Sequence, residues 1–328
     1  METCKSPRKV LKAAFALAAA CLKEHPSKFS RKDFTQPQLF ACLVLREHQK
    51  RSYRGLAALL DDCPEWRADI GLKKVPGHNT LCRAFHKLVK PKLFEAMLDR
   101  SVQAARQAQR ERKKQRRRNR QLRRKRRLVA IDSTMFESHH VSRHFERRCR
   151  QTSRNRRRKA RQAQADRQRS AVVKGLPKLS LGVQASSHFI LSARATTGGG
   201  ADYKHFAPLL TRAVARRPLD TALADAGYDS ESNHRLARFD LGVRTLIPAI
   251  SGRPGSGPPT GYYRRLMRRR FARRRRRKPY GQRWQVETVN SMIKRNLGSA
   301  CRAHTPRGRR KDMLLRVLTH NIMLLSNF

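Results

Sequence analysis

Three blocks rich in arginine and lysine interrupt this chain of 328 residues and restrict where a folded core can form. Residues 106–127 contain fourteen basic residues and one acid, Glu111. Residues 264–278 contain eleven basic residues, and residues 143–174 are similar. Like charges at this density repel one another, so we expect the blocks to stay solvated or disordered until a polyanion neutralises them. The hydrophobic core must therefore come from the segments outside the blocks.

The overall charge indicates the class of partner. Lys and Arg total 77 against 23 Asp and Glu, which gives a formal net charge of +54. Self-repulsion on this scale argues against a small-metabolite enzyme and favours a nucleic-acid partner, with an acidic membrane surface as the weaker alternative. No stretch reaches ~18 uncharged apolar residues, so we expect no membrane span. We expect a cytoplasmic, nucleoid-associated protein.

Amphipathic patterns typical of helices precede the first block. The spacing of apolar residues predicts a core helix over 36–47, a short helix over 53–60 and a third helix that begins at His78. A helix-turn-helix and a plain helical bundle fit this pattern equally well. We expect residues 1–105 to form a small all-helical DNA-binding domain, joined by the basic linker 106–127 to the rest of the chain.

After residue 127 the pattern becomes that of strands alternating with helices. Apolar or alternating runs predict strands at 128–131, 178–185, 188–195, 221–224 and 243–250, and amphipathic stripes predict helices at 203–217, 233–239, 282–297 and 311–325. This order predicts an α/β domain over 128–328, with a mixed sheet flanked by helices and with basic insertions at 136–177 and 251–279.

Acidic residues are rare in this chain, so their positions are informative. Asp132 and Asp225 each stand at the end of an apolar strand, where α/β folds place their sites. Two neighbouring carboxylates stay ionised together only beside a cation, and oxygen ligands suit Mg²⁺ or Mn²⁺. Two ions held by shared carboxylates support in-line displacement at phosphorus. Taken singly, either aspartate is better explained as a turn or cap residue.

A third carboxylate lies in a regularly spaced set. Two residues separate Tyr280 from Arg283, three separate Arg283 from Glu287, and six separate Glu287 from Lys294. On a helix the last three share nearly one face, because seven residues turn about 700°. That face presents one carboxylate for a metal and two cations for phosphates. The alternative is a surface ion pair between Arg283 and Glu287, which would matter little.

These residues resemble the DDE transposases of bacterial insertion sequences, in the group that carries the Tyr-Arg-Glu-Lys signature. The first two acids match in Ala-Ile-Asp-Ser-Thr around Asp132 and in Leu-Ala-Asp-Ala-Gly-Tyr-Asp-Ser around Asp225. The spaced set matches at all four positions. Further similarity lies at 52–56, 76–80 and 319–321. The resemblance covers most of the chain outside the basic blocks.

The resemblance implies a ribonuclease H-like catalytic fold. It implies a transposase that binds the ends of an insertion sequence, cleaves DNA and joins the 3′-hydroxyl ends to target DNA. Two Mg²⁺ (or Mn²⁺) ions would be held by Asp132, Asp225 and Glu287. A homo-oligomer would form on the DNA.

The resemblance also implies that the DNA strand at the transposon end is gripped by Tyr280, Arg283 and Lys294. One feature departs from some relatives: only 36 residues separate Ile250 from Glu287, too few for the large β insertion that those relatives carry. Whether the excised end passes through a hairpin is therefore left open.

Two other classes of function fit the sequence. A non-catalytic, arginine-rich nucleic-acid-binding protein would need only the basic blocks. A nuclease on the same fold would cut DNA without strand transfer, and its gene would lack flanking inverted repeats.

Overall fold

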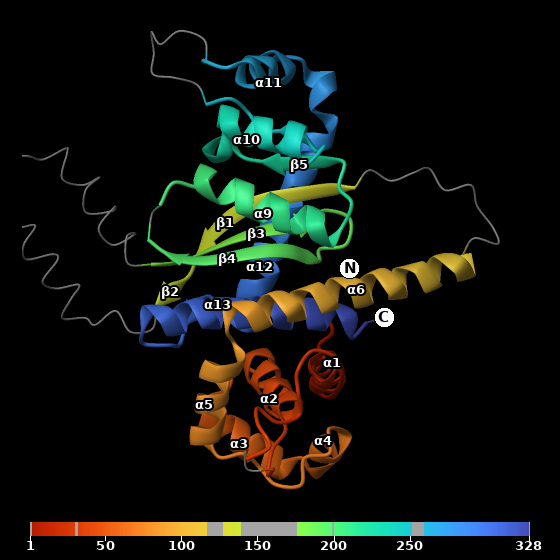
Figure 1. Cartoon of the computed structure of the whole chain (residues 1–328), viewed down its shortest axis with the longest axis vertical. Helices are drawn as coiled ribbons and strands as arrows, with labels where there is room; N and C mark the ends of the chain where they lie inside the picture. Colours follow the sequence, from red (N-terminus) through yellow and green to blue (C-terminus); the bar gives the residue numbers. More distant parts are fainter. Residues whose placement is uncertain are drawn as a thin grey trace, which may run out of the picture.

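A computed structural model describes residues 2–29, 32–116, 127–138, 176–198, 200–250 and 259–327, with the side chains of 112–116 and 274–278 excepted. The basic block 143–174 lies outside these residues. The described part begins with helices (Figure 1): α1 Pro7–Ala19, α2 Gln36–His48, α3 Tyr53–Asp62, α4 Pro64–Asp69, α5 His78–Leu88 and α6 Pro91–Arg116.

Local capping signals explain where several of these helices begin. Thr35 and Gln38 form a reciprocal capping box at the start of α2, and the hydroxyls of Ser6 and Ser52 cap α1 and α3. The three helices predicted from the sequence correspond to α2, α3 and α5. Helix α4 lies between α3 and α5, so a plain turn does not join those two.

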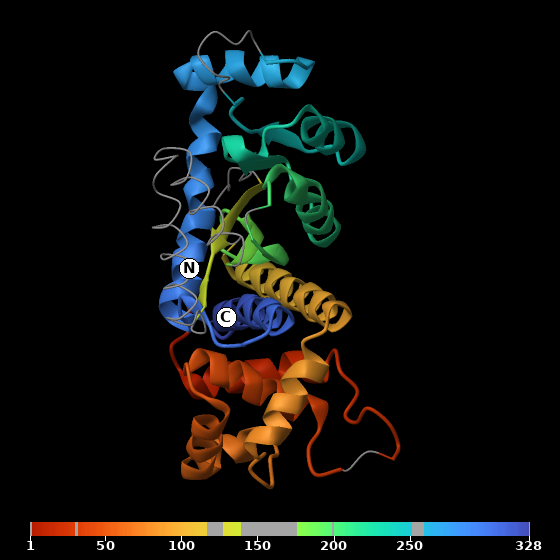
Figure 2. The same ribbon diagram turned by 90° about the vertical axis from the view of Figure 1, so that its left-hand side faces the viewer.

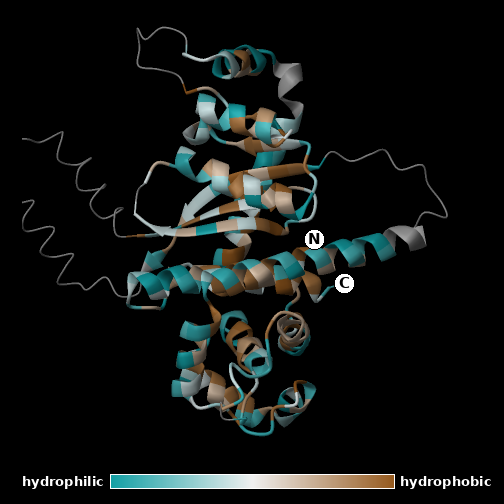
Figure 3. Cartoon of the chain, viewed as in Figure 1, coloured by the Kyte–Doolittle hydropathy of each residue, from teal (hydrophilic) through white to brown (hydrophobic). Residues whose placement is uncertain are grey.

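Helix α6 is longer than the sequence led us to expect. It runs from Pro91 to Arg116, through residue 105 and into the basic block 106–127. Its first half buries Met97, Leu98 and Val102, and the arginines and glutamines that follow are themselves good helix formers. Packing of the apolar half therefore anchors a helix whose charged end extends toward solvent (Figure 3).

A five-stranded mixed sheet forms the centre of the rest of the molecule, with the order β4-β3-β1-β5-β6. The pairs β1–β3 and β3–β4 are antiparallel, whereas β1–β5 and β5–β6 are parallel. The strands are β1 Leu128–Met135, β3 Pro177–Gln184, β4 Ile190–Thr197, β5 Thr221–Ala224 and β6 Arg244–Leu246. A short second sheet pairs β2 Glu137–Ser138 with β7 Ala300–Cys301.

Helices cover both faces of the five-stranded sheet, as predicted. Helix α9, Tyr203–Arg216, packs on one face, and α12, Trp284–Leu297, with α13, Pro306–Leu325, packs on the other (Figure 2). Ala130 and Leu223 belong to the core on the α12 side, whereas Val129, Ile131 and Ala222 belong to the core under α9. The core on the α12 side continues without a break into the N-terminal helices.

Between β5 and β6 lie η1 Ala226–Tyr228, α10 Glu231–Arg235 and η2 Leu236–Asp240. Strand β6 is shorter than the predicted strand at 243–250. Within the described residues, no helix is both long and apolar enough to cross a membrane.

The third basic block is helical and not disordered, although Arg265, Arg268 and Arg269 stay exposed to solvent as expected. It forms α11, Tyr262–Ala272, followed by the 3-10 segment η3, Arg274–Arg283. The Glu231 carboxylate accepts the backbone N–H groups of Tyr263 and Arg264 and so caps α11. Gly261 has φ +97°, and a Cβ there would lie 2.4 Å from the Glu231 carboxylate. A carboxylate outside the block thus organises the basic helix.

Candidate active site

Asp132 and Asp225 come together because their strands are parallel neighbours. Ile131 lies opposite Ala224 in the register of β1 and β5. The residues that follow these two, Asp132 and Asp225, therefore lie close together where β5 ends. Because side chains alternate between the two faces of a sheet, Asp132 points to the same face as Ala130, and this face packs against α12. Asp225 directly follows β5 and is two residues after Leu223, so it lies on the same α12 side of the sheet. Asp132 and Asp225 therefore both lie toward the helix that carries Glu287. The sequence predicted that Asp132 ends its strand, but β1 continues to Met135, so Asp132 lies inside β1 just past its last pair with β5.

Glu287 lies in the first turn of α12 and forms an ion pair with Arg283. The distance from Arg283 Nη2 to Glu287 Oε1 is 2.5 Å, and the Glu287 side chain is about half exposed at 51%. Arg283 itself belongs to η3, so the regular helix begins one residue later than the i,i+4 pair. The spacing predicted from the sequence is preserved across that junction.

The pKa values of the aspartates report the proximity of the three acids. Burial, with smaller contributions from Asp225 and Glu287, raises the pKa of Asp132 to about 6, although the Ser133 backbone N–H and Arg283 lower it. Burial also raises the pKa of Asp225; Arg283 opposes the shift, and Glu287 adds to it. Perturbed carboxyls gathered at one edge are typical of a functional site.

The two remaining residues of the spaced set lie at different distances from these acids. Tyr280 packs edge-on against Phe271, with ring centroids 4.8 Å apart, and it lies close enough to Arg283 and Asp225 for both to influence its pKa, which burial raises. Lys294 Nζ lies 5.6 Å from the ring centroid of Phe136, in a cation–π contact. Tyr280 thus belongs to the acidic cluster, whereas Lys294 lies beside the link between β1 and β2.

The chemistry of the donor set fits a divalent metal. All three groups are carboxylates, and Asp225 Oδ1 is buried without a hydrogen-bond partner. Among the residues that the structure describes, no three potential ligands are close enough together to hold an ion. Arg283 supplies the compensating positive charge instead, through its pair with Glu287 and its influence on both aspartates.

A polar group that the sequence did not reveal lies behind the two aspartates. Asp202, at the start of α9, accepts a hydrogen bond of 2.8 Å from Ser133 Oγ and pairs with Lys178 Nζ at 2.6 Å. The Tyr228 hydroxyl, in a residue only 1% exposed, has no hydrogen-bond partner among the described residues. Only Tyr228 gave a signal in the sequence, as part of the motif that follows Asp225.

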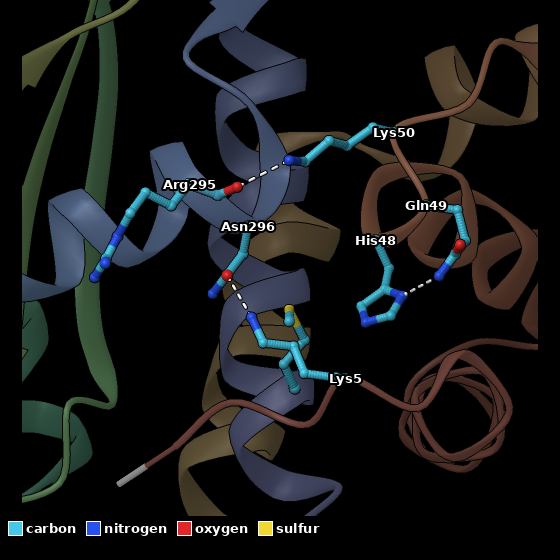
Figure 4. Close-up of a pocket in the computed structure, with 7 residues that line it drawn as sticks. Lys5, His48, Gln49, Lys50, Arg295 and Asn296 are labelled. Carbon is cyan, nitrogen blue, oxygen red and sulfur yellow. Dashed lines mark hydrogen bonds between the residues drawn. The ribbon is translucent and has the colours of Figure 1, made fainter.

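A separate pocket of about 290 Å³ lies away from the acids, where the N-terminal helices meet the end of α12 (Figure 4). Lys50 Nζ donates to the Arg295 carbonyl at 2.8 Å, and Lys5 Nζ donates to Asn296 Oδ1 at 2.5 Å. Nine residues turn about 900°, so Asn296 lies on the opposite face of α12 from Glu287. These lysines connect α12 to the N-terminal helices and are not part of the acidic cluster.

The comparison with known families agrees with this geometry. Residues 123–322 match the profile of the family described as "Transposase DDE domain", a span of 200 of the 328 residues that contains every strand of the five-stranded sheet. The chain therefore belongs to this family, whose members act on DNA and generally use divalent metal ions. No curated protein matches the chain.

Proposed function

We propose that the chain is a transposase of the Tyr-Arg-Glu-Lys group, which binds the ends of an insertion sequence, cleaves there and joins the ends to target DNA. One observation carries the proposal: Asp132 of β1 and Asp225 after the parallel strand β5 lie toward α12, whose first turn supplies Glu287, paired with the preceding Arg283. The net charge of +54 supports a DNA substrate.

Asp132, Asp225 and Glu287 would hold two Mg²⁺ or Mn²⁺ ions. When bound, such ions activate the attacking oxygen and stabilise the leaving oxygen in phosphoryl transfer. A water oxygen forms a bond to phosphorus while the bond to the 3′ oxygen of the transposon end breaks, which leaves a 3′-hydroxyl. That hydroxyl then attacks a phosphodiester of the target and displaces the target's own 3′ oxygen, so the number of P–O bonds is conserved.

The cationic members of the set would position the DNA. The guanidinium fork of Arg283 suits a phosphate next to the scissile bond, and binding that phosphate would draw Arg283 away from Glu287. Tyr280 lies beside Arg283 and would hold the same strand. Lys294, further along α12, would contact the backbone beyond it. The chain's own residues thus orient the substrate, while the carboxylates hold the ions.

The strand order β4-β3-β1-β5-β6 supports a ribonuclease H-like catalytic domain over 128–328. We assign end binding to the helices within residues 1–105, and the linker role to 106–127. The active form would be a homo-oligomer on DNA, and it would act in the cytoplasm at the nucleoid.

The test is cleavage and joining of a labelled DNA fragment that carries the ends flanking the gene, with Mg²⁺ or Mn²⁺. Asp225→Asn should abolish both reactions while DNA binding persists. The control is Asp240→Asn, which removes an exposed acid in η2, and it should react normally. An Asp225→Asn protein that cleaves at the normal rate would overturn the assignment.

The same assay separates the other two classes. A nuclease would cut the labelled ends and never yield joined products, and no inverted repeats would flank its gene. A non-catalytic binding protein would show neither product, and replacing Asp132 or Glu287 would leave its activity unchanged.

A further inference from the structure

Asp202 stands at the N-cap of α9 yet does not cap that helix. Its side chain makes no hydrogen bond to the backbone of the first turn, although aspartate is among the preferred capping residues. The carboxylate instead lies toward the sheet, where it accepts the bond from Ser133 Oγ and pairs with Lys178 Nζ. Asp202 therefore does not stabilise α9 as a cap but contacts Ser133 of β1 and Lys178 of β3.

Those contacts lie on the face of the sheet opposite to the one to which Asp132 points. Ser133 alternates with Asp132, so its hydroxyl points to the α9 face. Its backbone N–H nevertheless lies close enough to the Asp132 carboxylate to lower the pKa of that group. Ser133 thus holds Asp202 through its hydroxyl and directly follows Asp132 in β1.

The charge of Asp202 also reaches the acidic cluster directly. It is among the charges that act on Asp225 and on Tyr228. Lys178, with a side chain only 4% exposed, pairs with Asp202, and the two charges have opposite effects on the pKa of His205. The unpartnered Asp225 Oδ1 and the unpartnered Tyr228 hydroxyl lie within this same group.

We propose that Asp202 is a positioning residue of the metal centre, which aligns Asp132 through Ser133 and strengthens cation binding through its negative charge. The Ser133 and Lys178 contacts hold the Asp202 carboxylate in place. The proposal rests on the proposed function and adds a fourth acid to the three that would hold the ions.

The test measures Mn²⁺ binding to the full chain without DNA, by calorimetry or by the signal of free Mn²⁺ in electron paramagnetic resonance. Asp202→Asn should weaken Mn²⁺ binding roughly tenfold, at the lower end of the effect of outer residues on metal affinity. Ser133→Ala keeps the charge and removes the bond, so it should slow cleavage more than it weakens Mn²⁺ binding. This pair of variants separates alignment from charge.

A double variant excludes a purely structural role. Asp202→Asn leaves Lys178 buried without its counter-charge, which by itself can destabilise the fold. Adding Lys178→Gln should restore the urea midpoint but not the Mn²⁺ affinity. The matched control is Asp220→Asn, an acid paired with Arg127 at the other end of the same strands, and it should bind Mn²⁺ normally.

Two results would overturn the proposal. One is Mn²⁺ binding by Asp202→Asn that equals binding by the unaltered chain. The other is recovery of Mn²⁺ affinity in the double variant, which would make Asp202 only the partner of Lys178. A different variant tests the proposed function itself. If Asp132→Asn bound Mn²⁺ as tightly as the unaltered chain does, the proposed function would fail.

Discussion

Asp132 occupies a position that opposes its own ionisation. Burial and two neighbouring carboxylates raise its pKa to about 6 from an ordinary 3.8. A charge held in such a place reduces stability, and residues of this kind are retained for what they bind. The same position therefore has consequences for both stability and catalysis.

The first prediction concerns pH and stability without metal. A native carboxyl with a raised pKa binds its proton more tightly than the unfolded chain does, so its contribution to the free energy of unfolding falls as pH rises between about 4 and 6. The decline is at most about 3 kcal/mol, because one pKa unit corresponds to about 1.4 kcal/mol. Asp132→Asn should abolish this decline and be more stable than the unaltered chain near neutral pH, yet fail to cleave.

Urea titrations near pH 4.5 and near pH 7.5 check this expectation, with Asp240→Asn as the control that keeps the decline. A variant less stable than the unaltered chain at both pH values would contradict it.

The second prediction concerns Arg283, which pairs with Glu287 in the structure. Arg283→Ala should bind end DNA nearly normally, because many other cations supply affinity, yet react far more slowly, because a small misplacement of the phosphate is costly. Arg283→Lys should recover only part of the rate, since lysine lacks the bidentate fork. Gel-shift affinity beside a single-turnover rate checks this, and a proportional loss of both would reduce Arg283 to an ordinary backbone contact.

At the scale of elements, α13 stabilises the buried start of β4, the edge strand of the sheet. Asn321 accepts the N–H of Ile190 at 3.0 Å and donates to the carbonyl of the same residue at 3.0 Å, so one side chain satisfies both backbone groups at the start of β4. It also donates to Ser101 Oγ of α6. The motif at 319–321 thus joins three elements through a fully buried amide.

The third prediction follows from this clamp. Asn321→Ala leaves the two backbone groups of Ile190 buried without partners, which should lower the free energy of unfolding by about 2–4 kcal/mol. Ser326→Ala removes only a local bond within α13 and should cost well under 1 kcal/mol. Urea titration of both variants decides, and equal losses would show that the clamp adds nothing.

At the scale of the whole molecule, buried charges join the N-terminal helices to α13. Glu47 of α2 pairs with its neighbour Arg46 and with Arg316 of α13 at 3.4 Å, and Arg46 also pairs with Asp312 at 3.5 Å. Each of these side chains is at most 4% exposed. Breaking such pairs is costly, because it leaves uncompensated charges in the core.

The fourth prediction is that the N-terminal helices and the domain built on the five-stranded sheet unfold together. The chain has two tryptophans, Trp66 in α4 and Trp284 in α12, so the single variants Trp66→Phe and Trp284→Phe each report one part. The shared core and the buried charge pairs should make the two fluorescence transitions in urea coincide. Two separated midpoints would instead favour residues 1–105 as an independent domain.

The fifth prediction concerns the basic block 143–174. Each phosphate neutralised on duplex DNA contributes about −0.9 to the slope of log affinity against log salt. Deleting the block should flatten that slope and weaken binding to all DNA sequences alike. Salt titrations on end DNA and on random DNA check it, and lost discrimination at an unchanged slope would make the block a sequence reader.

Local sequence patterns predicted the strands of the central sheet, most of the helices that cover it and the positions of the three acids in the chain. Periodicity predicted the five strands of the central sheet, because alternating burial is visible in neighbouring residues. It made β1 too short, since that strand continues to Met135, and it made β6 too long. The position of Asp225 after a strand and the i,i+4 spacing of Arg283 and Glu287 are equally local properties. Asp132 lies inside β1, because β1 continues along β3 after its pairing with β5 ends. The metal-binding and DNA-binding roles of these residues stay predictions.

Which residues far apart in the sequence contact one another depends on the tertiary structure. The parallel pairing of β1 with β5 brings Asp132 beside Asp225, and the start of α9 brings Asp202 to Ser133. The helical state of α11 depends on Glu231, a carboxylate that lies more than thirty residues earlier. In each case the deciding contact joins residues far apart in the chain, and a local pattern of charge or hydrophobicity carries no information about such a partner.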